Sequence, residues 1–198
     1  MLIINGAYSL STVAINSGAT LKGTGTVTTT TVAAGGTLSI GNSPGCMTIA
    51  GLLTLTAAST YTQEIASATP CSGYDVATVT GNATLGNATL NIVPSYTPNV
   101  GQVFTILTAS SVVGTYNGLP DGSLVTVSGL TFRINYTATN VTLTFVSGTL
   151  TPALVPTLAP TGQNSNQTAL LAFGVLSMAL AGLGLEYGTR RRKHNAKV

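Results

Sequence analysis

Three short runs that begin with glycine decide the fold: Gly18-Ala19-Thr20-Leu21, Gly35-Gly36-Thr37-Leu38 and Gly51-Leu52-Leu53-Thr54-Leu55. They start 17 and 16 positions apart, and Gly81-Asn82-Ala83-Thr84-Leu85 begins a further copy after a longer insertion. Short β-branched or apolar runs precede them, as in Val13-Ala14-Ile15. Because one such unit cannot bury its own apolar residues, the repetition of strand, turn and strand predicts stacked coils.

We therefore predict an all-β fold, a right-handed parallel β-helix over residues 1–148. Leu21, Leu38 and Leu55 are expected to point inward and to stack on one another in successive coils. An antiparallel sandwich is the alternative, since evenly spaced short strands also occur there. The short repeat is lost between Gln102 and Val146, which predicts a C-terminal β cap that covers the last coil.

Charged side chains are rare in the body of the chain and concentrated at its end. The last residues, Glu186 to Val198, carry a net charge of +4. A protein that binds nucleic acid needs Lys and Arg spread over a face that follows the phosphates, so we expect no nucleic-acid partner. The body up to Gln167 has a net charge of −1 from five side chains: Lys22, Arg133, Glu64, Asp75 and Asp121.

Several stretches between residues 13 and 146, taken together, resemble the β-helix stalk repeats of autotransporter passenger domains and related adhesins. The resemblance implies a structural or adhesive surface protein with an unknown surface ligand. No outer-membrane barrel follows Val146, so the autotransporter export route is not supported. The stretches are Gly41–Leu55, Ser59-Thr60-Tyr61 with Glu64-Ile65, Asp75, Val79-Thr80-Gly81, Gln102–Leu107 and Gly114-Thr115-Tyr116.

The residues after 148 have the composition of a linker, a membrane span and a basic tail. Pro152, Pro156 and Pro160 predict an extended linker over residues 149–167. The uncharged run Thr168–Leu185 would span ~27 Å as a helix, close to the thickness of the bilayer core, and we place a single transmembrane helix at residues 168–187. A buried core helix is the alternative to this membrane span.

A basic tail at residues 188–198 completes this arrangement. Its cluster Arg190, Arg191, Arg192 and Lys193 is expected to stop transfer and to keep the C-terminus in the cytoplasm, with the β domain outside. No N-terminal signal peptide is apparent. Either the protein stays in the cytosol, or Met1 is an internal start within a longer exported protein, which the C-terminal features favour.

The order of motif, polar spacer, apolar run and basic cluster resembles the sorting signal of sortase substrates in monoderm bacteria. The motif is Leu158, Ala159, Pro160, Thr161 and Gly162, a variant with Ala159 where the commonest motif has proline. The resemblance implies that a sortase cysteine attacks the Thr161 carbonyl, releases Gly162 onward and transfers the chain to an amine of the peptidoglycan. Sortase and the cell wall are thus expected partners. A plain membrane anchor, not cleaved by sortase, is the alternative.

Residues suited to catalysis are few. The single histidine, His194, lies in the basic tail, so no Ser-His-Asp or Cys-His arrangement can form in the exported domain. Glu64 and Asp75 are the one pair that a polysaccharide-degrading β-helix enzyme could use, but Asp75 and Asp121 are more simply interpreted as turn residues. Metal ligands at recognisable spacing are missing. We expect a non-enzymatic protein without cofactor or metal.

Two cysteines, Cys46 and Cys71, lie beside turn residues in the domain that we place outside the cell. Disulfides persist in that compartment, so we predict that the two are bonded, with two buried reduced thiols as the alternative. Asn-x-Thr sequences occur in this Thr-rich chain, and we assign them no role. They start at Asn82, Asn87, Asn135, Asn140 and Asn166.

Overall fold

Fifteen β-strands make up the regular structure of residues 1–8 and 11–150, which are the residues that the computed structural model describes. These residues contain no helix, so the predicted all-β class is confirmed. The predicted linker from residue 151 on, the sorting motif, the apolar run and the basic tail lie outside the described residues. Residues 1–8 and 11–150 belong to one compact unit.

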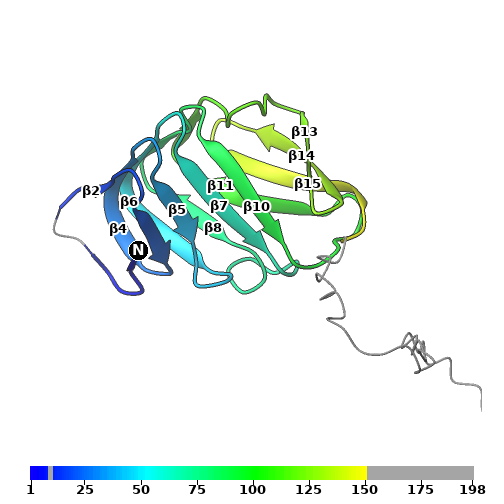
Figure 1. The fold of residues 1–198 in the computed structure, drawn as a ribbon, viewed down its shortest axis with the longest axis horizontal. Helices are drawn as coiled ribbons and strands as arrows, with labels where there is room; N and C mark the ends of the chain where they lie inside the picture. Colours follow the sequence, from blue (N-terminus) through cyan, green and yellow to red (C-terminus); the bar gives the residue numbers. More distant parts are fainter. Residues whose placement is uncertain (9–10, 151–198) are drawn as a thin grey trace, which may run out of the picture. The chain divides into compact units, whose positions relative to one another are not determined.

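The smaller sheet is entirely parallel (Figure 1). Its strands follow one another across the sheet in the order in which they occur along the chain. They are β1 (Leu2–Ile3), β3 (Thr20–Gly23), β5 (Thr37–Ile40), β7 (Thr60–Ile65) and β10 (Thr89–Pro94).

The larger sheet has ten strands, and their pairing changes from parallel to antiparallel toward the C-terminal end of the described chain. Its first seven strands along the chain, β2 to β12, pair with one another in parallel. The other edge of β11 pairs antiparallel with β15, and β15, β14 and β13 continue the sheet in antiparallel pairs. These antiparallel strands come from the region where the sequence repeat is lost. The ten are β2 (Val13–Ile15), β4 (Thr26–Val32), β6 (Cys46–Leu55), β8 (Val76–Val79), β9 (Asn82–Thr84), β11 (Val103–Thr108), β12 (Ser111–Val113), β13 (Leu124–Val127), β14 (Leu130–Tyr136) and β15 (Asn140–Gly148).

The chain alternates between the two sheets from β1 to β12. Each strand of the smaller sheet is followed by one or two strands of the larger sheet, and each return places the new strand beside the earlier one of the same sheet. Apolar residues of both sheets form one buried cluster, with Leu38 and Tyr61 from the smaller sheet and Ile49 from the larger among its fully buried members. Figure 1 shows β5, β7 and β10 side by side in front of the strands of the larger sheet.

Leu21 and Leu38 stack as predicted, but the placement of Leu55 as the third residue of their column was wrong. The paired column in the smaller sheet runs from Leu21 to Leu38, then to Tyr61 and Leu90. Leu55 is buried, but it lies in β6 of the larger sheet, beside Val32. The runs at Gly18 and Gly35 belong to one sheet and those at Gly51 and Gly81 to the other. The nearly even spacing of the first three runs therefore led to a prediction that placed residues of two separate columns in one.

Tight turns connect the strands of the larger sheet to those of the smaller one. In residues 16–19, 33–36 and 56–59 the fourth amide donates to the first carbonyl at 2.8 to 3.0 Å. The third residue has a positive φ in each turn, 75° at Gly18, 76° at Gly35 and 63° at Ala58, as a type II turn requires. The Gly18 amide donates to the Gly35 carbonyl and the Gly35 amide to the Ala58 carbonyl, so the turns also stack.

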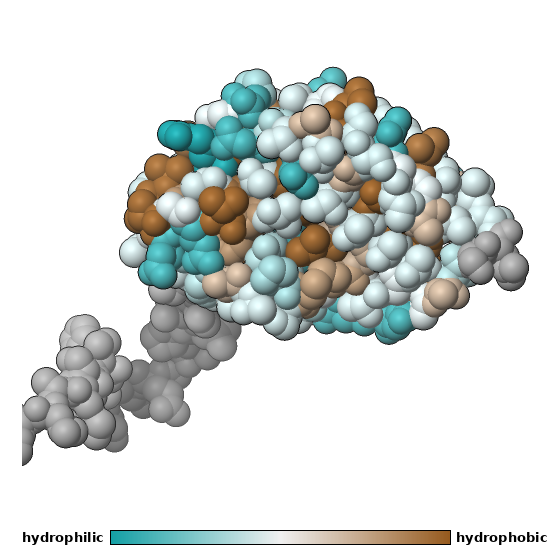
Figure 2. Space-filling model, turned by 180° about the vertical axis from the view of Figure 1, so that it is seen from behind, coloured by the Kyte–Doolittle hydropathy of each residue, from teal (hydrophilic) through white to brown (hydrophobic). Residues whose placement is uncertain are grey.

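Threonine rather than charge covers the outer faces of both sheets. Thr20, Thr37, Thr60 and Thr89 are paired in register across the smaller sheet. A second row in the larger sheet contains Thr26, Thr48 and Thr78. β-Branched threonine suits a half-buried pleated surface and presents a hydroxyl group to water. Figure 2 shows the result, a mostly pale surface on which hydrophobic residues form small scattered patches.

Candidate functional site

The two cysteines are joined by a disulfide in the structure, with their Cα atoms 4.8 Å apart. Cys46 is the first residue of β6, and Cys71 lies in the segment between β7 and β8. This segment, residues 66–74, is named the 66–74 loop below. The bond therefore ties the loop to the larger sheet. It is the one expected site that lies within the described residues.

Hydrogen bonds within the 66–74 loop give it a shape of its own. The amides of Ala66 and Ser67 both donate to the Gly73 carbonyl, and the amides of Gly73 and Tyr74 donate to the Thr69 carbonyl. Tyr74 is buried, and its ring meets that of Phe104 edge-on with 5.2 Å between the ring centres. The loop is thus held by the aromatic contact of Tyr74 at its end and by the disulfide of Cys71.

Asp75 follows the loop directly, and its carboxylate is fully buried. One oxygen accepts a 2.7 Å hydrogen bond from the Gly45 amide, and the other accepts a 2.8 Å hydrogen bond from the Glu64 amide. The carboxylate therefore joins three segments: the turn at residues 41–45, strand β7 and the end of the 66–74 loop. Glycine is required at position 41, because a Cβ atom there would lie 2.5 Å from the Asp75 carboxylate oxygen.

Burial dominates the ionisation of Asp75. Loss of water around the carboxyl raises its pKa to about 7, although the hydrogen bonds from the Glu64 and Gly45 amides lower it. The nearby Glu64 carboxylate raises the pKa further, and the Lys22 ammonium lowers it. Two amide donors stabilise a carboxylate, but at this site they do not offset its removal from water.

Gln63 completes the buried polar cluster. Its side-chain Nε2 donates at 2.6 Å to the backbone carbonyl of Asp75, and Gln63 itself is fully buried. Its Oε1 is buried without a hydrogen-bond partner among the described residues. Sequence reasoning missed this cluster, because an isolated Gln-Glu pair in a Thr-rich strand carries no recognisable signal.

The interpretation of Asp75 as a turn residue was wrong, because Asp75 lies buried between the 66–74 loop and β8, whereas Asp121 does lie in a turn. Asp121 is exposed within the turn of residues 120–123, where the Ser123 amide donates to the Pro120 carbonyl. Its carboxylate accepts a 2.9 Å hydrogen bond from the Tyr136 amide and a 3.3 Å bond from the Asn135 side chain. Asp75 differs because the 66–74 loop and the 41–45 turn cover it.

The geometry of Asp75 also affects the alternative in which Glu64 and Asp75 are the catalytic acids of a polysaccharide-degrading enzyme. Such a pair must flank a sugar bond with both carboxyl groups open to the substrate. Asp75 is covered, and both of its oxygens are used by backbone amides. The arrangement is therefore suited to holding the chain together and not to acid-base attack on an external polymer.

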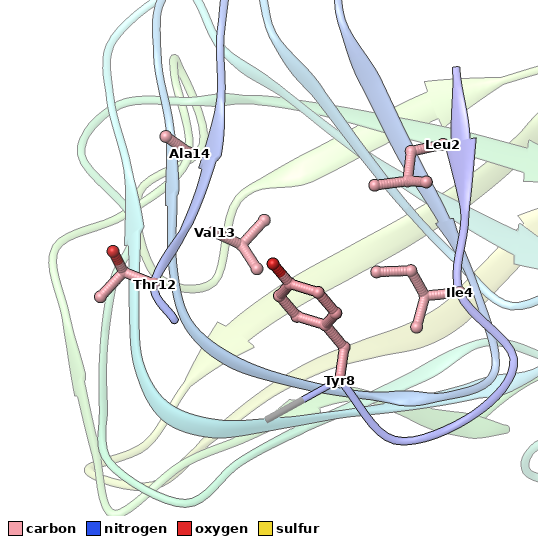
Figure 3. Close-up of a pocket in the computed structure, with 6 residues that line it drawn as sticks. All are labelled: Leu2, Ile4, Tyr8, Thr12, Val13 and Ala14. Carbon is pink, nitrogen blue, oxygen red and sulfur yellow. The ribbon is translucent and has the colours of Figure 1, made fainter. Parts of the chain in front are cut away.

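A shallow apolar hollow of about 320 Å³ lies at the N-terminal end of the described strands (Figure 3). It opens between β1 and β2, with Leu2 and Ile4 on one side, Val13 on the other and the Tyr8 ring between them. None of the described lining residues is charged. The hollow was not predicted, since these residues were expected to form an ordinary coil.

Metal or membrane features are not found in the part of the chain that the structure covers. Residues 1–8 and 11–150 contain no group of three or more His, Cys, Asp or Glu side chains that could hold a metal ion. The same residues include no helix long and apolar enough to cross a bilayer. Leu158–Gly162, Arg190–Lys193 and the apolar run between them lie outside the described residues.

Comparison with known proteins gives no relative from which a function could be transferred. No known family model matches the chain, and a search of the curated proteins found no match.

Proposed function

We propose that this protein is a structural or adhesive bacterial surface protein, exported and covalently anchored to the cell wall by a sortase. The observation that carries the proposal is the order of features after the β domain. The pentapeptide Leu158–Gly162 is followed by a polar spacer, the uncharged run Thr168–Leu185 and the cluster Arg190–Lys193. An apolar run that ends in a basic cluster can hold the chain in the membrane while a transpeptidase reaches the motif.

The β domain would serve as a stalk, in the form of a right-handed parallel β-helix with a C-terminal cap. Support comes from the alternation of strands between two sheets and from their parallel, in-register pairing, as in the Thr20, Thr37 and Thr60 row. Such coils contact only their neighbours, so the domain can be extended coil by coil. The antiparallel β13–β15 would protect one end from pairing with other chains.

The disulfide between Cys46 and Cys71 fits an exterior location. Disulfides persist outside the cell, whereas cytosolic thiols are kept reduced. The sparsely charged, hydroxyl-covered surface fits a stalk that makes few electrostatic contacts with its surroundings.

The anchoring step would be an acyl transfer at Thr161. The sortase thiolate attacks the Thr161 carbonyl carbon, the peptide bond to Gly162 breaks, and the amine of Gly162 leaves with a proton. A cell-wall amine then attacks the thioester, forms a new amide with Thr161 and returns the thiol. Leu158 would be the apolar anchor in the sortase groove, and Ala159 would select the sortase class. Pro160 would favour an extended segment in that groove.

Cell fractionation of the native host tests this proposal against a plain membrane anchor. We expect wild-type protein in the wall fraction and a Thr161→Ala variant in the membrane fraction. Thr157→Ala is the matched control, because it removes the same side chain one position before the motif, and it should fractionate like wild type. Equal membrane retention of all three proteins would exclude sortase anchoring and leave the plain anchor.

A further inference from the structure

The 66–74 loop has few attachments to the two sheets. Its ends meet where the Asp75 amide donates to the Glu64 carbonyl at 3.0 Å, and the Val76 amide donates to the Gly45 carbonyl at 3.0 Å. Most of its remaining backbone hydrogen bonds stay within the loop. Residues 68–72 are exposed. The Cys46–Cys71 disulfide and the buried Tyr74 ring also attach the loop, so opening is local and confined to the contacts of the Asp75 carboxylate with the 41–45 turn and β7.

Asp75 is the one carboxylate that joins the base of this loop to the 41–45 turn. Its two oxygens are bonded to amides from segments 19 residues apart in sequence, at Gly45 and Glu64. The carboxylate is fully buried, and neither oxygen has an ion-pair contact among the described residues. A buried carboxylate without a cation in contact is costly to ionise, so its protonation and the closure of the loop are coupled.

We propose that the Asp75 carboxyl is a pH-dependent catch that keeps the 66–74 loop and the 41–45 turn closed in acid and loosens them as the pH rises. The charged and titratable groups that face it are few. Glu64 and the Tyr61 hydroxyl come from β7, and Lys22 comes from β3. Glu64 repels the ionised form and Lys22 attracts it, so neither changes the direction set by burial.

The direction follows from proton linkage. The Asp75 pKa is about 7 in the closed form, whereas a carboxyl that reaches water has a pKa of about 4. Opening therefore releases a proton between these values, and each rise of one pH unit favours opening about tenfold. Above pH 7 the carboxyl is ionised in both forms and the effect stops. From pH 5 to pH 8 the opening equilibrium should rise about 100-fold.

Hydrogen exchange of the Gly45 and Glu64 amides measures this opening, because these amides donate to the Asp75 oxygens. The full chain in detergent is compared at pH 5, 6, 7 and 8, with rates corrected for intrinsic exchange. We expect the corrected rates at both amides to rise about 100-fold and to level off above pH 7. The amide of Leu38, in the middle of the smaller sheet, is the internal control and should keep its protection across this range.

Two variants separate the catch from general effects of pH. Asp75→Asn cannot ionise, so its corrected exchange at Gly45 and Glu64 should be independent of pH. Asp121→Asn is the matched control, since Asp121 also accepts a backbone amide but is exposed, and it should behave like wild type. A wild-type rate that is flat between pH 5 and 8 would overturn the proposal, even if Asp75→Asn fails to fold. So would equal pH dependence in Asp75→Asn and wild type.

Discussion

The hydroxyl group of Tyr136 connects two parts of the antiparallel region. It donates a 2.8 Å hydrogen bond to the Leu119 carbonyl and accepts a 3.2 Å hydrogen bond from the Tyr116 amide. Tyr136→Phe removes both bonds and leaves the buried amide unpaired, so we expect the free energy of unfolding to fall by about 1–3 kcal/mol. Denaturant unfolding measures the loss. Tyr8→Phe, at an exposed hydroxyl, should change it by less than about 0.5 kcal/mol, and equal losses in both variants would contradict the assignment.

The Cys46–Cys71 disulfide closes a stretch with a sequence separation of 25 residues. In the chain-entropy account, a closed loop of this length stabilises the folded state by about 3 kcal/mol. Replacing both cysteines with serine should therefore lower the free energy of unfolding by about that amount. The control is Ser72→Ala at an exposed position of the same loop. A double variant that unfolds at the same denaturant concentration as wild type would show that the disulfide adds no stability.

At the scale of one strand, Gly51 allows β6 to pass close to β4. The register of the two strands shifts between Thr28 and Thr30, and a Cβ atom at position 51 would lie 2.9 Å from the Thr29 amide nitrogen. Gly51→Ala should lower the free energy of unfolding by about 1–3 kcal/mol more than Gly118→Ala. Both glycines have a positive φ, but Gly118 faces open space. Similar losses, measured by thermal or denaturant unfolding, would show that backbone strain alone matters.

Local sequence signals were sufficient for individual elements but not for sheet membership. The run Val13–Ile15 was recognised before its glycine repeat, and it forms a strand with these bounds. Leu55 was misplaced because successive strands of the smaller sheet are separated by different numbers of residues. The paired residues Thr20, Thr37, Thr60 and Thr89 lie 17, 23 and 29 positions apart, so no single period describes them. The long β6 and the 66–74 loop supply the additional residues.

The candidate site was predictable only where it rests on residue type. Two cysteines beside turns were enough to predict a pair, and the structure bonds them. The role of Asp75 was not predictable, because its burial depends on a loop of mostly small residues without periodicity. A carboxylate beside such residues has the sequence signature of a solvated turn. Asp75 is instead buried by tertiary contacts with the 41–45 turn.

In the whole molecule, a nearly uncharged β domain is followed by a C-terminal segment with a different composition. Buried apolar columns from both sheets supply the stability of the domain. Rows of threonine replace charged residues on its surface. The features that suggest a cellular role come after the domain, from Leu158 onward. The proposed function therefore depends most on what happens to the chain at Thr161.

Mass spectrometry of protein released from the cell wall of the native host identifies the C-terminal residue of the anchored chain. We expect wall-digesting enzymes to release a chain whose C-terminal residue is Thr161, carrying a peptidoglycan fragment on its new amide. Residues from Gly162 to Val198 should be missing from that chain. Recovery of only intact chains that end at Val198, in the membrane fraction, would contradict covalent anchoring.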